Sequence, residues 1–390
     1  MGSSLLTNRS AMTALQTLRA IDSNLDKSRD RISTGLRINN AGDNTAYWSI
    51  SSMMKHDHNT MGAVVDAINL GKEQISIAAT AVDLTKEALD DIQKSMITVN
   101  EKGEVDIAKL QDSMKGNMTN ISNAVQSASF AGKNILSNGG QAVSIASGYR
   151  REGAAVYVDM IEVGGAELNF GVMGEDGTID MTQGILQNIF GEGTEAEAVK
   201  REEVPKLSDA IETLNGAWEE YKEKLDAVMA AQVALATNPS DEDLQSTLSD
   251  AQGELEDAQS DWDDAKGEFK KSTDKVSLAE FIALSDFNAI PAEGQKILLG
   301  SLQNTVRAAV DLTLTAGAKI GSAVNLVNTQ LEFVKRLMDN VEAGIGSMVD
   351  ADMNAESAKL SALQVQQQLG VQALSIANQG SQNILLLFRN

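Results

Sequence analysis

Histidines, cysteines and converging carboxylates do most catalytic and metal chemistry in proteins, and this chain offers few of them. Its two histidines are His56 and His58, and it has no cysteine, so neither disulfides nor thiolate chemistry are available to it. An H-x-H pair on a helix directs its rings toward different faces, and zinc sites need three or four protein ligands. We therefore interpret both histidines as solvated side chains, and expect no catalytic, cofactor-binding or metal-ligating residue.

Two other patterns resemble ligand sites only superficially. The glycine-rich residues 171–174 lack the strand, helix and lysine of a phosphate-binding loop, so we interpret them as a turn. The acidic runs 241–243 and 261–264 lack the alternating ligands and glycine bend of a calcium loop. A solvated acidic face is the simpler interpretation, and the sequence does not favour an enzyme.

The charge of the chain excludes some partners. Its formal net charge is −23 and its pI is near 4.5, which argues against binding nucleic acid or an anionic membrane. The first ten residues lack the apolar core of a signal peptide, and the apolar residues 384–388 are too few to span a bilayer. The composition leaves open whether the protein stays in the cytoplasm or is exported without a cleavable signal.

Both ends of the chain carry apolar residues at helical spacing, which indicates long amphipathic helices. The spacing predicts helices at 5–34, 45–100 and 105–130, the first ending at Gly35. A second apolar series runs from Val327 to Met348, and the similarity of the two ends suggests that they meet. The candidate seam residues for assembly are Leu15, Leu18, Ile21, Leu25, Ile32, Leu36, Leu369, Leu374, Ile376, Ile384, Leu385, Leu387 and Phe388.

The middle of the chain differs from its ends. Residues 143–147, 155–163 and 167–173 are short β-branched stretches between glycines, which predicts small β-hairpins. Residues 201–270 hold 19 acidic and 6 basic residues, a net of −13, and predict an antiparallel helical hairpin at 205–236 and 240–275. In that hairpin, Ser240 and Asp243 suggest a capping box, and Trp218 and Trp262 are expected to pack between or beneath the arms.

Together these patterns predict a mainly α fold with a small β region and an inserted helical hairpin. We expect three parts: a terminal helical core of 1–44 with 346–390, a long-helix domain of 45–190 with 285–345, and an exposed acidic domain of 191–284. The terminal seams could form an ordinary intramolecular bundle. However, residues 384–388 are apolar all round a helix, which favours burial against neighbouring copies in an open helical filament.

Particular residues at both ends of the chain form two signatures, within roughly residues 3–135 and 300–390. The amino-terminal part includes Ser4-Leu5-Leu6-Thr7-Asn8, Arg31-Ile32-Ser33-Thr34-Gly35-Leu36-Arg37-Ile38-Asn39-Asn40-Ala41, Asp43 and Ala46. The carboxy-terminal part includes Asp350-Ala351-Asp352-Met353, Glu356, Gln364, Gln366-Gln367-Gln368, Gln372-Ala373-Leu374-Ser375-Ile376-Ala377-Asn378, Gln382 and Leu385 to Arg389. These two signatures resemble the amino-terminal and carboxy-terminal signatures of bacterial flagellins. Within that family, Tyr47-Trp48-Ser49-Ile50 and Phe388-Arg389 look most like the alphaproteobacterial branch.

The resemblance implies a structural subunit that polymerises into the flagellar filament and serves swimming motility. Its terminal helices would form inner and outer coiled-coil tube layers. The unfolded chain would be exported through the flagellar secretion channel to an extracellular filament. The implied partners are further copies of the chain, other flagellins, an export chaperone, and cap and junction proteins.

Two departures from the family and two alternative functions accompany this resemblance. Asp90 and Asp91 stand where flagellins recognised by an animal innate receptor carry an arginine-bearing stretch, and the helical insert differs from the family's common β-rich outer domains. A hook–filament junction protein shares the amino-terminal style, whereas the glutamine-rich residues 350–389 favour the filament subunit. An adhesin role for the insert stays open, but a zinc protease there is excluded because the insert has no histidine.

Overall fold

The computed structural model describes residues 8–102, 107–153, 155–174, 177–191, 207–274, 276–284 and 287–387, with backbone alone for 99–102 and 380–387. The chain divides into two compact units, Met1–Asp66 with Glu332–Asn390 and Ala67–Leu331. No helix in these described ranges is long and apolar enough to cross a membrane. The three-part division expected from the sequence remains a prediction.

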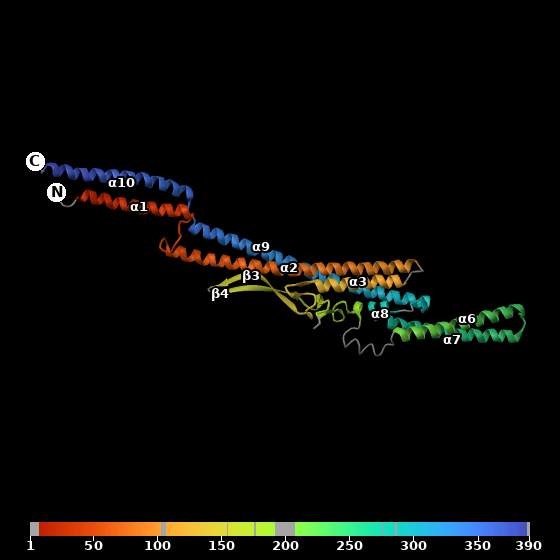
Figure 1. Cartoon of the computed structure of the whole chain (residues 1–390). Helices are drawn as coiled ribbons and strands as arrows, with labels where there is room; N and C mark the ends of the chain where they lie inside the picture. The colour runs from red at the N-terminus through yellow and green to blue at the C-terminus, as the bar shows by residue number, and fades with distance from the viewer. Residues whose placement is uncertain are drawn as a thin grey trace. The chain divides into compact units, whose positions relative to one another are not determined.

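The first unit contains α1 (Arg9–Thr34) and α10 (Met353–Leu387), which lie side by side and are here called the terminal helix pair (Figure 1). The Asn8 side chain caps the start of α1 by accepting a 3.0 Å hydrogen bond from the Ala11 N–H. The helix ends at Gly35, as predicted, because that residue adopts a left-handed φ of 72° and donates its N–H to Arg31 O. The helix expected from residue 5 is described only from Arg9 onward.

The ends of the chain do meet, but through a different helix from the one suggested by the second apolar series. That series lies on α9 (Ala292–Val349), which is continuous and separate from α10. In the first unit, Met338 lies against Gly62 on α2 (Thr45–Lys102), while Ile345 and Val349 pack with Ile38 in a small core. Helix α9 ends at Val349, beside residues 36–38. There Arg37 and Ile38 both donate their N–H groups to Val349 O, which therefore has partners outside its own helix.

The second unit is built around the remaining length of α2, together with α3 (Ile107–Ser127) and the first part of α9. Its inner residues follow the helical spacing of the sequence and are almost completely buried: Ile68, Ile75, Leu89, Ile92, Met96, Met114, Ile121 and Val125. Their recurrence at helical spacing gives α2 and α3 a buried face, as expected of amphipathic helices.

The β region consists of three two-stranded antiparallel sheets in the described chain. They pair β1 (Ser129–Phe130) with β2 (Lys133–Asn134), β3 (Ala142–Glu152) with β4 (Ala155–Gly164), and β5 (Val172–Met173) with β6 (Ile179–Asp180). The β3–β4 hairpin confirms two expected strands and is longer than predicted.

The third expected strand, 167–173, is wrong for most of its length. Its first residues lie in the 3-10 helix η1 (Ala166–Leu168), and only Val172–Met173 is a strand. Phe170 is fully buried and donates its N–H to Leu136 O, so apolar residues here fill a small core from an irregular segment. A short apolar run cannot distinguish these two possibilities by its pattern alone.

The acidic insert forms the predicted helical hairpin, with α6 (Leu207–Thr237) antiparallel to α7 (Glu242–Thr273). Trp218 and Trp262 meet between the helices at 5.0 Å between ring centroids. The capping prediction is wrong, because Asp241 rather than Ser240 accepts the bond from Leu244 N at 3.2 Å. A carboxylate at this position also interacts favourably with the positive end of the helix dipole.

The base of the α6–α7 helical hairpin packs against α9 within the second unit. An added Cβ at Gly294 on α9 would come within 2.6 Å of Leu214, and Phe269 and Ile290 also line this position. Four short elements also belong to this unit: η2 (Met181–Gln183), α4 (Gln187–Phe190), α8 (Leu278–Ala283) and η3 (Phe287–Ala289). Of these, α4 contacts η2 and α8, and α8 contacts α3. Ser277 and Glu280 form a reciprocal capping box at the start of α8.

Candidate functional site

Three polar links at different heights set the register of the terminal helix pair. Asn8 Nδ2 donates to Ala377 O at 2.9 Å, and Gln367 Nε2 donates to Asp22 Oδ1 at 2.6 Å. The third link joins Ser28 Oγ to Glu356 Oε1 at 2.8 Å. A shift of either helix along the other would break all three hydrogen bonds together, so these side chains select one antiparallel alignment.

Glu356 is a largely enclosed ionisable group of this pair, with only 12% of its side chain exposed. Burial by itself raises the pKa of Glu356, but the Ser28 hydrogen bond and the charges of Lys359 and Arg31 outweigh it, and the pKa is lowered overall. The carboxylate lies 3.4 Å from Lys359 Nζ and 3.9 Å from Arg31 Nη1. The folded pair therefore favours the ionised form of Glu356, which accepts a hydrogen bond from Ser28 and lies beside Arg31 of α1.

The apolar contact within the pair is narrow. Leu25 and Leu363 are buried, whereas the predicted seam residues Leu18, Ile21, Ile32 and Leu374 are only partly covered. An added Cβ at Gly370 would come within 3.0 Å of Leu18 Cδ1, which places this glycine where α1 approaches α10 closely. Leu36 packs beyond the end of α1, against the small core of Ile38, Ile345 and Val349.

Other predicted seam residues face outward. Leu15, Leu369 and Ile376 are 37%, 58% and 70% exposed, so the pairing of α1 with α10 leaves them uncovered. Met12, Val365 and Val371 are likewise exposed, and the sequence reasoning did not include them. For Val365 and Val371 the signal was present in the sequence of α10, whose apolar residues are not confined to one face, so a single partner helix cannot cover all of them.

The remaining predicted seam residues lie at the carboxy-terminal end. The backbone of α10 includes Ile384, Leu385 and Leu387, but their side chains lie outside the described part of the chain, as does the whole of Phe388. The assembly role assigned to these four residues stays a prediction.

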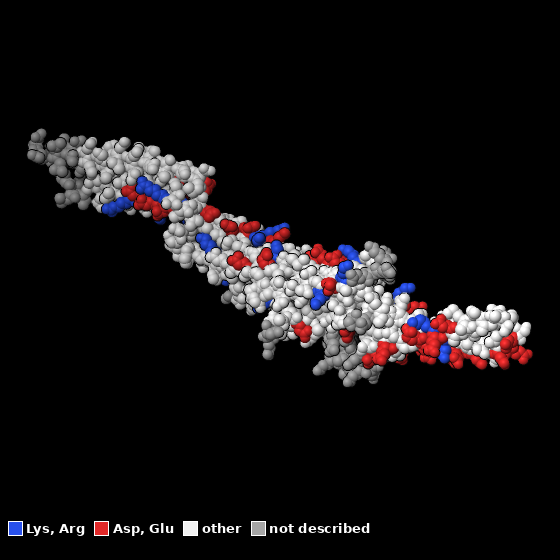
Figure 2. All heavy atoms as spheres, turned by 45° about the vertical axis from the view of Figure 1, so that its right-hand side comes forward, with Lys and Arg blue, Asp and Glu red and all other residues white. Residues whose placement is uncertain are grey.

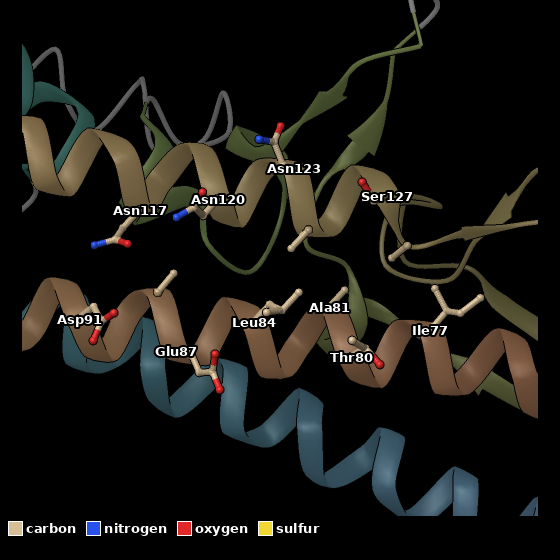
Figure 3. Close-up of a pocket in the computed structure, with 13 residues that line it drawn as sticks. Ile77, Thr80, Ala81, Leu84, Glu87, Asp91, Asn117, Asn120, Asn123 and Ser127 are labelled. Carbon is tan, nitrogen blue, oxygen red and sulfur yellow. The ribbon is translucent and has the colours of Figure 1, made fainter.

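A second feature of interest is a groove between α2 and α3 in the second unit, here called the α2–α3 groove (Figure 3). Its cavity volume is about 550 Å³, and Asn117 and Asn120 extend from α3 toward α2 (Figure 3). Glu87 and Asp91 are among the lining residues from α2, and Asp91 forms a 3.0 Å ion pair with Lys94. Across the described ranges, no three His, Asp or Glu side chains gather where they could hold a metal ion.

A mainly helical chain with paired ends and outward apolar residues has the features of a self-associating structural subunit. Family-model comparisons match the bacterial flagellin N-terminal helical region to residues 5–141 and the C-terminal helical region to residues 298–388. The chain belongs to the bacterial flagellin family.

Flagellins of other bacteria match nearly the whole chain. The flagellin of Bartonella bacilliformis is 64% identical over 96% of this chain and 97% of its own length. Flagellin A of Rhizobium meliloti is 32% identical over 99% of this chain and 100% of its own. The flagellin of Brucella melitensis biotype 1 (strain ATCC 23456 / CCUG 17765 / NCTC 10094 / 16M) is 32% identical over 99% of each chain.

Membership of the flagellin family confirms the class of protein expected from the sequence. The protein is a structural subunit, not an enzyme, and it self-assembles into the exported, extracellular flagellar filament that serves motility. The comparisons with known proteins do not favour the junction-protein alternative.

Proposed function

We propose that the uncovered apolar side chains of the terminal helix pair pack against neighbouring copies and hold the filament together. The observation that carries this proposal is the exposure of Leu369 and Ile376, at 58% and 70%, on a helix already paired with α1. Burial of one large apolar side chain contributes roughly 1.5–3 kcal/mol. Repeated in every subunit, such contacts would supply a large share of the assembly free energy.

The polar links within the pair support this proposal. Ser28, Asp22 and Asn8 hold α1 to α10 in one alignment, so each copy presents the same outward surface. A fixed alignment matters because a helical filament repeats one contact at every subunit. The seam residues Ile384, Leu385, Leu387 and Phe388 would extend the same apolar surface to the end of the chain.

The proposal includes further partners, and it gives each part of the chain a position in the filament. An export chaperone, the filament cap, the junction proteins and other flagellins would contact the terminal segments during unfolded export and polymerisation. The terminal core of 1–44 with 346–390 would lie innermost, the long-helix part of 45–190 with 285–345 would surround it, and the acidic part of 191–284 would face solvent.

A paired substitution tests the assembly surface. Serine at both Leu369 and Ile376 removes two large apolar side chains, while Val233→Ser alters a residue that is also 70% exposed but lies on α6. We expect the double variant to elongate preformed filament seeds at least tenfold more slowly, at an unchanged helical content of the monomer. The Val233→Ser control should elongate normally. Normal elongation by the double variant would contradict the proposal.

A further inference from the structure

The sulfur atoms of this chain all belong to methionine. The sequence has 15 methionines and no cysteine, so an oxidant that attacks sulfur can react only with thioether groups. The fold shields some of these groups and leaves others open. Met61 and Met114 are 1% and 0% exposed, whereas Met12 and Met229 are 63% and 48% exposed. An oxidant in solution therefore reaches Met12 and Met229 directly.

Met12 lies in a section of the terminal helix pair that has several uncovered apolar side chains. Two polar links bound this section, from Asn8 to Ala377 and from Asp22 to Gln367. Between the links lie five exposed apolar side chains: Met12, Leu15, Leu369, Val371 and Ile376. Met12 is thus part of the surface that the proposed function assigns to contacts with neighbouring copies.

Oxidation of a thioether makes a polar group out of an apolar one. A peroxide transfers one oxygen atom to the methionine sulfur: the O–O bond breaks, an S–O bond forms, the sulfur loses two electrons, and hydrogen peroxide is reduced to water. The sulfoxide oxygen accepts hydrogen bonds, and its burial without a donor is unfavourable. The other four side chains of this section are aliphatic, so they offer no donor.

We propose that Met12 is a redox-sensitive modification site, at which oxidation by a peroxide blocks addition of the free subunit to the filament. This inference rests on the proposed burial of the terminal helix pair between copies. A subunit with Met12 sulfoxide presents a polar group where the contact requires an apolar one. In an assembled filament the same thioether is shielded, and enzymatic reduction of the sulfoxide restores the free subunit.

The first test compares monomers before and after treatment with dilute hydrogen peroxide, at a dose that leaves the buried Met61 unmodified by mass spectrometry. We expect treated wild type to elongate seeds at least fivefold more slowly than untreated wild type. Treated Met12→Leu should keep most of its own untreated rate, because leucine has no sulfur. The comparison is made within each variant, since Met12→Leu alters the contact surface itself. Equal loss in wild type and Met12→Leu would overturn the inference.

The matched control is Met229→Leu, which removes an exposed methionine of α6 outside the terminal helix pair. Its untreated rate should equal that of wild type, and treatment should slow it as much as wild type. Treated wild type is also incubated with methionine sulfoxide reductases for both sulfoxide epimers. Elongation should recover as Met12 returns to its original mass. Return of the mass without return of elongation would overturn the inference.

A second measurement uses the unmodified chain and does not depend on the variants. Met12 should be oxidised at least tenfold more slowly in filaments than in the monomer, while Met229 should react at similar rates in both. Equal rates at Met12 in the two states would overturn the inference, and the serine variant at Leu369 and Ile376 would still test the proposed function separately. Untreated wild type that cannot elongate seeds would instead overturn both proposals.

Discussion

Ser28 and Glu356 stand 328 residues apart in the chain, yet the Ser28 hydroxyl donates a 2.8 Å hydrogen bond to the Glu356 carboxylate. Ser28 is fully buried, so its hydroxyl depends on this partner. The bond joins the last third of α1 to the first turn of α10 and thereby contributes to the alignment of the terminal helix pair.

Acid should weaken this link in a predictable direction. The folded pKa of Glu356 is lowered from its ordinary value of 4.5, although burial opposes the shift, so the ionised group stabilises the folded pair above that ordinary value. The contribution is lost as the pH falls below 4.5 and through the folded pKa. The melting temperature of the monomer, measured from pH 7 to pH 3, should therefore decrease less steeply in Glu356→Gln than in wild type.

Glu356→Gln keeps the size of the side chain and an acceptor for Ser28, so it removes mainly the charge. A matched control is Glu332→Gln, which removes an exposed carboxylate of α9 from a 3.5 Å pair with Arg336. Equal pH dependence of Glu356→Gln and wild type would show that Glu356 does not contribute to acid sensitivity.

Removal of the last seven residues should abolish assembly. The deleted segment, 384–390, includes the apolar seam residues Ile384, Leu385, Leu387 and Phe388, each worth roughly 1.5–3 kcal/mol when buried. We expect a folded monomer by circular dichroism that fails to elongate filament seeds in electron micrographs. Filaments of normal length from the truncated chain would refute this expectation.

The acidic hairpin should be dispensable beyond its base. Much of its surface is acidic (Figure 2), and the base around Leu214 and Phe269 shares a core with Ile290. Replacement of residues 222–258 by a short Gly/Ser link should leave both the fold and filament assembly intact. Seeded elongation measures this outcome, and complete loss of assembly by a soluble, folded variant would show that the distal hairpin makes obligatory contacts.

Disruption of the packing at the base of the helical hairpin should lower the stability of the second unit, unlike removal of the distal hairpin. Phe269 is fully buried, so Phe269→Ala should lower the free energy of unfolding by about 3–5 kcal/mol. Urea denaturation followed by the fluorescence of the Trp218–Trp262 pair measures this loss. A change below about 1 kcal/mol would contradict the packing at the base.

Asp90 and Asp91 should weaken recognition by the animal flagellin receptor. Both are charged side chains on α2, paired at 2.7 Å with Lys86 and at 3.0 Å with Lys94, and Asp91 lines the α2–α3 groove. The Asp90→Arg, Asp91→Arg double variant replaces these acids with the positive charge that receptor-recognised flagellins carry in this stretch. It should therefore increase signalling in a reporter-cell assay on purified monomer, because complementary charges across an interface favour binding. Strong signalling by the unmodified chain, at the level of a stimulatory flagellin, would contradict this prediction.

The sequence by itself determined the long helices and most of their inner faces. Ile75, Leu89 and Ile121 are buried as helical spacing requires, since the 3.6-residue period places them on one face whatever lies opposite. Gly35 ended its helix for an equally local reason, because glycine adopts the left-handed conformation without steric cost. The helical hairpin around Trp218 and Trp262 was predicted from similar local signals.

Only the tertiary structure decided which surfaces meet. The apolar spacing of α1 is compatible with any apolar helix, and hydrogen bonds such as Ser28 to Glu356 select α10 rather than the end of α9. The irregular segment around Phe170 likewise follows from a local core that no periodicity encodes. The exposure of Ile376 and Val158 depends on which neighbours are already in place, because a side chain is uncovered only with respect to a particular arrangement of the chain.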